Sequence, residues 1–188
     1  MTFGKVLPGR REIRNGLVLA LGLTLLMVAS AIAGNMHFSG GGGTWNSPLT
    51  FEGVLVGLGH QLGVTVTATA FGTVPAECTN RGGNVAPGIK PLSVQASATG
   101  EWIFDETGRA SGSTGEIIPT LPDPPPTAKQ AGCPNGNWRV TGVVEERVSW
   151  ASVHAVAIAD DGSTDEIFLT CTTSFRADGT TFGVCTES

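Results

Sequence analysis

The side chains that could carry out nucleophilic or acid–base chemistry are few and scattered along this 188-residue chain. A hydrolytic triad needs a serine or cysteine nucleophile, a histidine that takes its proton and an acid that orients the histidine. The three histidines are His37, His60 and His154. No Gly-x-Ser-x-Gly motif occurs, and the SGSTG stretch at 111–115 has a different spacing. We therefore predict no catalytic residue and keep a small hydrolase as an alternative function.

The acidic residues offer two other kinds of chemistry. A glycosidase needs two carboxyl groups at a fixed separation in a groove. Candidates for these groups are Glu101, Glu145, Glu146 and Glu166. A calcium site could use the acids around one predicted turn, which are Asp160, Asp161, Asp165 and Glu166. Acids on the solvent face of strands are ordinary, however, and the cluster at the turn lacks the alternating ligand spacing of a calcium loop. We predict neither a metal site nor a cofactor.

The four tryptophans divide into core and surface candidates. An exposed tryptophan on a β domain can stack against the apolar face of a sugar ring. Trp102 and Trp150 lie in strand patterns, which favours burial. Trp45 precedes the first regular strand, and Trp138 follows a cysteine turn. Trp45 and Trp138 are therefore the candidates for ligand binding.

A loop rich in glycine and asparagine, CTNRGGN at 78–84, is the second candidate binding feature. Its backbone amides could form an anion-binding nest, or Asn80 and Asn84 could hold a sugar with Arg81 beside them. The alternative is a tight turn that a disulfide holds to a neighbouring segment. We favour the tight turn, because glycine and asparagine tolerate left-handed backbone angles.

The first 33 residues have the order of a secretory signal peptide. Basic residues between positions 5 and 14 precede an apolar run at 17–32, and Ala31-Ile32-Ala33 supplies a cleavage site before Gly34. The alternative is a retained membrane anchor, because the apolar run is close to the roughly 17-residue minimum for crossing a bilayer. Cleavage predicts a secreted, extracellular protein that makes no membrane contact.

Residues 34–188 carry 7 basic and 15 acidic side chains, for a formal charge of −8. Affinity for nucleic acid depends on basic groups that neutralise phosphates, and this composition gives no concentrated basic face. Nucleic acid is therefore not a predicted partner. The partners that remain are extracellular proteins and glycans.

The chain after residue 48 shows short strands and no convincing helical period. In the run at 62–71 valine and alanine alternate with threonine, a pattern typical of a half-buried strand. Similar runs occur at 49–59, 91–97, 100–105, 111–120, 137–159, 166–175 and 181–185. The longest run is expected to bend near 145–148, and a proline-rich passage at 121–132 is expected to be a linker or an extended loop. We predict a flexible glycine-rich lead-in at 34–47 and a single domain at 48–188, an immunoglobulin-like antiparallel β-sandwich.

Four cysteines follow the signal peptide, and their wide spacing in an oxidising compartment indicates two disulfides rather than a zinc site. Three pairings are open in principle. A hairpin turn centred on Asp178 places Cys171 opposite Cys185. That register favours a Cys171–Cys185 disulfide, which leaves Cys78 to pair with Cys133.

The other hairpin turn bears on His154. If Asp161 and Gly162 form a two-residue turn, His154 lies opposite Leu169 within a strand. Such a position favours a packed or edge histidine over a general base.

Two cysteine motifs resemble those of a known group. CTNRGGNVAPGIKP at 78–91, followed by CPNGNW at 133–138 and a valine-rich strand, resembles a group of small exported bacterial proteins of unknown function. Members carry a similar Cys-x-Asn-x-Gly-Gly-Asn motif and a later Cys-Pro motif. The resemblance covers most of the exported portion and implies a secreted all-β domain without an assigned activity. It also implies that Cys78 and Cys133 pair with each other.

These features together favour a secreted, non-enzymatic interaction or surface-associated module. One alternative is a carbohydrate-binding module that uses Trp45 and Trp138. The other is the small secreted hydrolase.

Overall fold

The computed structural model of this chain describes residues 36–45, 48–59 and 62–187. These residues belong to one compact unit. The predicted signal peptide at 1–33 and the turn at His60 lie outside the described residues.

Strands account for most of the described residues. They are β1 (His37–Trp45), β2 (Leu49–Val56), β3 (Gly63–Asn80), β4 (Val85–Ile103), β5 (Arg109–Ile117), β6 (Trp138–Val143), β7 (Ser149–Ala159), β8 (Thr164–Phe175) and β9 (Thr181–Glu187). The helical elements of the described residues are the four-residue helix α2 (Ala128–Ala131) and the 3-10 turn η1 (Glu145–Arg147). The prediction of an all-β, antiparallel fold is confirmed.

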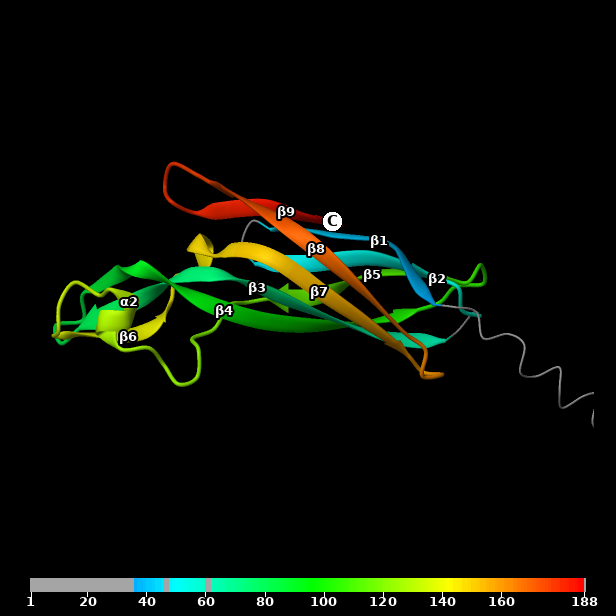
Figure 1. The fold of residues 1–188 in the computed structure, drawn as a ribbon, viewed down its shortest axis with the longest axis horizontal. Coiled ribbons are helices and arrows are strands. Elements are labelled where there is room, and N and C mark those ends of the chain that lie inside the picture. The colour runs from blue at the N-terminus through cyan, green and yellow to red at the C-terminus, as the bar shows by residue number, and fades with distance from the viewer. Residues whose placement is uncertain (1–35, 46–47, 60–61, 188) are drawn as a thin grey trace, which may run out of the picture. The chain divides into compact units, whose positions relative to one another are not determined.

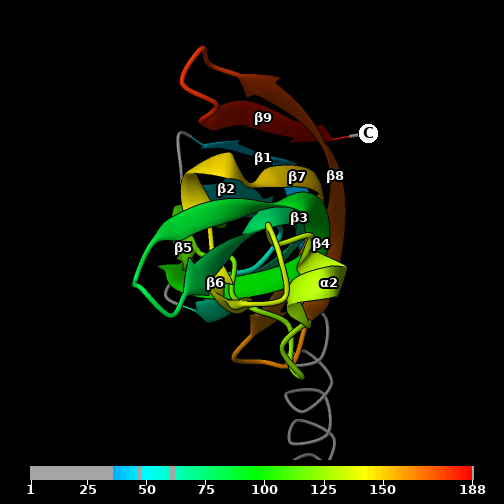
Figure 2. The ribbon, with the colours of Figure 1, turned by 90° about the vertical axis from the view of Figure 1, so that its left-hand side faces the viewer.

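All nine described strands belong to one sheet. Its order is β4-β3-β7-β8-β9-β1-β2-β5, with β6 also pairing with β3. The sheet is barrel-like: it curls around a core (Figure 2), and its two end strands approach each other where Trp102 Nε1–H of β4 donates to the Ser113 carbonyl oxygen of β5 at 3.2 Å. The expected immunoglobulin-like sandwich of two sheets is thus corrected. Alternation shows which face of a strand is buried, but it does not identify the neighbouring strand.

The strand β3 is long enough for two strands to share one of its edges. β7 pairs with residues 64–73 of β3, and β6 pairs with residues 76–80. β4 runs along the other edge of β3. The bend predicted near 145–148 is confirmed, because η1 separates β6 from β7. β6 and α2 therefore lie at the far end of β3, on the left of Figure 1.

The barrel-like sheet encloses one main hydrophobic core. The valines and alanines at 64–70 of β3 face this core in strict alternation with half-exposed threonines, as the sequence predicts. Trp102 and Trp150 are buried in it, which confirms their predicted role. A second, smaller cluster lies where β3 pairs with β6, in the part of the domain made of residues 75–91 and 118–143 that we call the β6 end. It consists of buried Ala76, Cys78, Leu92 and Ala131. Partly buried Trp138 packs against this smaller cluster.

The predicted flexible lead-in is wrong for residues 37–45, which form β1 between β2 and β9. Its four consecutive glycines suggest flexibility, yet two of them are needed for close packing. A β carbon at Gly41 would lie 3.2 Å from the Phe51 ring, and one at Gly43 would lie 2.9 Å from the Thr50 carbonyl oxygen. Glycine here lets the strand approach its neighbours closely.

The hairpin between β7 and β8 has a three-residue loop instead of the predicted two-residue turn. Gly162 adopts a positive φ of 86° at its end, and His154 consequently pairs with Phe168 rather than with Leu169. The His154 and Phe168 rings stack with centroids 4.2 Å apart, and His154 Nε2 lies 2.8 Å from Glu166 Oε2. His154 is thus partly exposed and stacked on the outer face of β7, beside Phe168 instead of the predicted Leu169. That it is not a general base stays a prediction.

Both predicted disulfides are present. Cys171 and Cys185 are direct partners across β8 and β9, in the predicted register. Cys78 in β3 is bonded to Cys133, with 5.8 Å between the α carbons. Disulfides indicate an oxidising compartment. Among the described residues, no helix is long and apolar enough to span a membrane.

Candidate functional site

A concave surface at the β6 end brings together most of the residues that the sequence indicated for ligand binding. We call it the Trp138 pocket, and its volume is about 550 Å³. Its lining residues are Thr79, Asn80, Arg81, Gly83, Gly136, Asn137, Trp138 and Arg139. Trp138, Arg81 and Asn80 were predicted, whereas Asn137 and Arg139 were missed. The pocket thus combines an indole, two guanidinium groups and two side-chain amides.

Pairing between β3 and β6 sets the positions of these groups. Asn80 lies directly opposite Trp138, and Thr79 lies opposite Arg139. Successive side chains on a strand point to opposite faces, so Trp138 and Arg139 border the pocket from the two sides of the β3–β6 pair. The pocket therefore lies at the end of this pair, where β3 continues into the turn after Asn80 and β6 is preceded by the turn at 133–137.

The loop between β3 and β4 is a tight turn organised by Asn80. The Asn80 Oδ1 accepts hydrogen bonds from the backbone N–H groups of Gly82 at 2.9 Å and Asn84 at 3.0 Å. Gly83 has a φ of 77°, which glycine adopts without strain. The favoured interpretation of this loop, a turn held by a disulfide, agrees with this geometry. Asn84 is exposed and does not line the pocket.

The second wall of the pocket is also held by local bonds. Asn135 Oδ1 accepts from the Asn137 backbone N–H at 3.0 Å, and the Asn135 carbonyl oxygen accepts from the Trp138 N–H at 3.1 Å. Cys133 ties this turn to β3 through its disulfide. The helix α2 precedes it, capped by reciprocal bonds between Thr127 and Gln130. The proline-rich passage is thus part of the domain and contains a helix that the sequence analysis missed.

Trp45 is not a surface residue. Its side chain is 3 % exposed and belongs to the main core, at the end of β1. The error follows from the assumed lead-in, since a residue in a flexible segment would lie outside the fold. Trp138 is therefore the one tryptophan of the four that retains more than marginal exposure.

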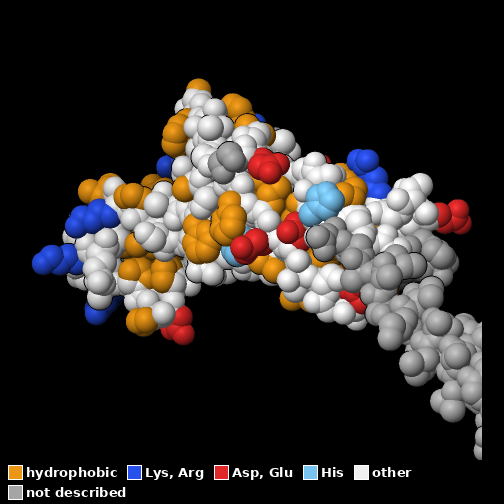
Figure 3. Space-filling model, turned by 45° about the vertical axis from the view of Figure 1, so that its right-hand side comes forward, with side chains coloured by type: hydrophobic (Ala, Val, Ile, Leu, Met, Phe, Trp, Pro, Cys, Tyr) orange, Lys and Arg blue, Asp and Glu red, His pale blue; other side chains and the backbone are white. Residues whose placement is uncertain are grey.

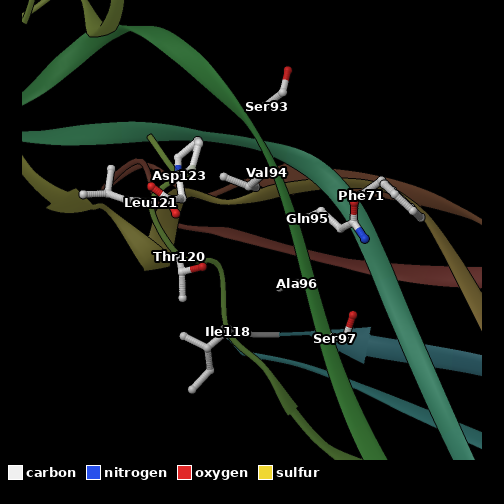
Figure 4. Close-up of a pocket in the computed structure, with 11 residues that line it drawn as sticks. Phe71, Ser93, Val94, Gln95, Ala96, Ser97, Ile118, Thr120, Leu121 and Asp123 are labelled. Carbon is white, nitrogen blue, oxygen red and sulfur yellow. The ribbon is translucent and has the colours of Figure 1, made fainter. Parts of the chain in front are cut away.

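A larger cavity of about 760 Å³ lies beside β4, and we call it the β4-edge pocket. All five residues at 93–97 line it, so it borders the edge of the strand rather than one face. Figure 4 shows Phe71 and Gln95 on one side of β4, and Leu121 and Asp123 on the other. No residue predicted to bind a ligand lines this pocket.

The acidic candidates for catalysis and calcium binding are divided among other sites. Glu145 and Glu146 line a third cavity of about 440 Å³ together with Glu116, Asp178 and Arg176. Glu101 accepts a hydrogen bond from Thr65 on the outer face of β3. The remaining candidates engage the fold: Asp160 accepts from the Gly63 N–H, Asp165 from the Phe38 N–H and Asp161 from the Ser163 N–H. Within the described residues, no group of three or more histidines, cysteines or acids could hold a metal ion.

Three exposed aspartates stabilise turns, and their hydrogen bonds alter their titration. A bond from the Thr107 side chain is the main cause that lowers the pKa of Asp105. Backbone N–H groups of Ser163 and Thr180 likewise lower the pKa of Asp161 and Asp178. These carboxylates therefore serve as turn caps.

Comparison of the chain with protein-family models, with curated proteins and with solved structures finds no match. The resemblance drawn from the cysteine motifs therefore stays a prediction, and the case for a function depends on the geometry of the site.

Proposed function

We propose that this chain is an exported, non-enzymatic carbohydrate-binding module and that the Trp138 pocket is its binding site. The observation that carries this proposal is the meeting of Trp138, Arg81 and Asn80 around one cavity. An indole face packs well against the apolar face of a sugar ring. Guanidinium and amide groups supply hydrogen-bond donors for sugar hydroxyls.

The rigidity of the pocket supports the same proposal. Its two walls are joined by the Cys78–Cys133 disulfide and by the β3–β6 pairing. Asn80 and Asn135 fix the two turns through their own side chains. A site that is ordered before the ligand arrives loses less conformational entropy on binding, which favours affinity for small polar ligands.

Export is part of the proposal. The signal-like order of residues 1–33 motivates it, and the two disulfides are consistent with an oxidising destination. Mass spectrometry of the protein recovered from the medium of a producing culture tests this step. A mature chain that begins at Gly34 is the expected result, and retention of residues 1–33 in the cell membrane contradicts it.

Tryptophan fluorescence tests the binding site directly, because Trp45, Trp102 and Trp150 are at most 4 % exposed and only Trp138 can respond to a ligand at the surface. We expect a shift in emission when a panel of soluble polysaccharides is added, and loss of that shift and of binding in Trp138→Ala. Phe71→Ala, which removes an exposed aromatic ring from the β4-edge pocket, is the matched control and should bind normally. Binding that survives in Trp138→Ala would refute the site.

A second candidate function, recognition of an extracellular protein, is favoured by the β4-edge pocket. Among the described strands β4 pairs with β3 alone, and β5 approaches its other edge near Trp102. Residues 93–97 of that edge border the pocket and could accept an added strand, with exposed Phe71 and Ile118 as flanking apolar contacts. An array of extended peptides with alternating apolar residues tests this function. Binding that is lost in Phe71→Ala and kept in Trp138→Ala would favour it over carbohydrate binding.

The hydrolase alternative would depend on the cavity that contains Glu145 and Glu146. It predicts turnover of esters, peptides or glycosides by the wild-type protein. Turnover that disappears in Glu145→Gln or Glu146→Gln would replace the binding proposal, and inactivity across the panel would remove the alternative.

A further inference from the structure

The charges of the described residues are strongly segregated. The β6 end, residues 75–91 and 118–143, carries four basic side chains, Arg81, Lys90, Lys129 and Arg139, and two acidic ones, Glu77 and Asp123. The remaining described residues carry 3 basic and 13 acidic side chains. The β6 end thus has a formal charge of +2, whereas the rest has −10.

Figure 3 shows blue basic side chains gathered at the left end of the domain, while red acidic side chains are spread over the face, with a further blue group at the upper right. The two acids of the β6 end do not line the Trp138 pocket. Glu77 accepts a hydrogen bond from Thr141, and Asp123 lines the β4-edge pocket. Among the residues that the structure describes, no carboxylate lines the Trp138 pocket.

The two guanidinium groups of the pocket are available for a ligand. Arg81 and Arg139 are both exposed, and within the described residues neither lies within ion-pair distance of a carboxylate. Lys90 is held at the same end by a bond from its Nζ to the Lys129 carbonyl oxygen at 3.4 Å. Guanidinium groups bind carboxylate and sulfate oxygens in bidentate geometry, and these bonds are stronger than those to neutral hydroxyls.

From this arrangement we propose that the Trp138 pocket binds an acidic saccharide, one whose sugar rings bear carboxylate or sulfate groups. The inference rests on the proposed carbohydrate-binding function and adds the chemical class of the sugar. Trp138 contacts the ring, while Arg81 and Arg139 bind the anionic substituents. The acidic remainder of the domain repels a polyanion, so the acidic polysaccharide binds at the β6 end only.

A nucleic acid is a poorer fit than an acidic saccharide. Nucleic-acid binding draws on many phosphate contacts, commonly about 6–10 for a specific protein. The pocket offers two guanidinium groups, and the adjoining surface carries the opposite charge. The pocket therefore suits a ligand that presents one or two anionic groups to the two arginines, rather than a continuous row of phosphates.

The experiment measures binding of four probes to the disulfide-bonded protein by calorimetry at low salt. The probes are polygalacturonate, dextran sulfate, uncharged dextran and single-stranded DNA. We expect polygalacturonate, dextran sulfate or both to bind at least about tenfold more tightly than dextran, with affinity that falls as salt is raised. The stronger of the two charged probes identifies the carboxylated or the sulfated class.

Variants locate the binding. Arg81→Gln and Arg139→Gln should each weaken binding of the charged probe about tenfold, and both should keep the wild-type circular dichroism spectrum because the side chains are exposed. Arg109→Gln is the matched control, since Arg109 is an exposed arginine at the start of β5 in the acidic remainder. It should bind like the wild type.

The outcomes separate the two proposals. Binding of dextran that needs Trp138 and is unaffected by Arg81→Gln and Arg139→Gln would keep the carbohydrate-binding function and overturn the acidic class. Absence of saccharide binding to any probe would overturn both. DNA binding as tight as that of the charged polysaccharides would also overturn the saccharide class.

Discussion

The Cys78–Cys133 disulfide should control the order of the binding site, whereas Cys171–Cys185 should affect stability alone. The perturbation compares the double variants Cys78→Ala/Cys133→Ala and Cys171→Ala/Cys185→Ala. In the chain-entropy model the stabilisation grows with the length of the closed loop. The sequence separations are 55 and 14 residues, which correspond to about 4 and 3 kcal/mol respectively.

The two double variants should differ by only about 1 kcal/mol in global stability. We expect them to differ more clearly in the order of the binding site. Apart from the disulfide, β6 is attached to the domain by pairing with five residues of β3 and by packing of Trp138 and Val140 against a cluster of four buried side chains. Leu92 is the only one of these four that is larger than a cysteine. Without the disulfide, β6 and the turn before it should therefore open locally while the main core stays folded.

Urea unfolding gives the stabilities, and hydrogen exchange gives the local order. In Cys78→Ala/Cys133→Ala we expect amides of β6 to exchange at least about tenfold faster while those of β7 keep their protection relative to global unfolding. Saccharide affinity should fall in this variant and stay unchanged in Cys171→Ala/Cys185→Ala. Reduction of the wild-type protein with dithiothreitol provides a check without side-chain truncation.

Two results would refute this reasoning. Equal protection of β6 and β7 amides in Cys78→Ala/Cys133→Ala would mean that pairing with β3 holds the site without the disulfide. A loss of saccharide affinity in Cys171→Ala/Cys185→Ala would mean that the pocket depends on the β8–β9 hairpin at the other side of the sheet.

Three further predictions concern the fold. Thr114 is 5 % exposed and accepts from the Phe51 N–H, so Thr114→Val should lower the free energy of unfolding by about 1–3 kcal/mol in urea titration. Gly183→Ala should lower the free energy of unfolding in urea by about 1–3 kcal/mol or more, because the added β carbon would collide with Thr172 and Trp45. Gly40→Ala is the control: no atom lies within 4 Å of its added β carbon, so the free energy of unfolding should change by less than about 0.5 kcal/mol. The lowered pKa of Asp105 stabilises the fold above the unfolded pKa of about 3.9, and this stabilisation is lost as pH falls through the folded pKa. Asp105→Asn should therefore reduce the dependence of stability on pH below about 4, and an unchanged pH profile would contradict the turn-cap role.

The strands and disulfides could be predicted from the sequence because local constraints fix them. Alternation of valine and threonine defines a buried face for β3. The turn at Asp178 and two cysteines on one face fix the register of β8 and β9, and this register was correct. The closure of the sheet was not predictable in the same way, since it depends on pairings between β9 and β1 and between β1 and β2. In β1, glycine hides the alternation, because it leaves no side chains to reveal a buried face.

Three of the five side chains that supply the indole, guanidinium and amide groups of the site could also be predicted from the sequence. Trp138, Asn80 and Arg81 were identified from their residue types and from the turns around them. Asn137 and Arg139 carried a signal that was not used, because a Cys78–Cys133 bridge places the turn after Cys133 beside the turn after Cys78. The basic character of the β6 end was hidden by the net charge of −8 for residues 34–188, which is the sum of +2 and −10.

The length of β3 explains how one sheet can carry both a stable core and a separate binding surface. Its first two thirds pair with β7 and β4 around the main core, and its last residues pair with β6 around the smaller cluster. Trp138 of the pocket packs against the smaller cluster, and the residues that line the pocket include no member of the main core. Because substitutions of exposed residues usually change stability by less than about 0.5 kcal/mol, changes at Arg81, Asn137 or Arg139 should alter ligand affinity with little effect on the barrel-like sheet. The disulfide lies within the part that carries the pocket, where it joins Cys78 in the last residues of β3 to Cys133 in the turn that precedes β6.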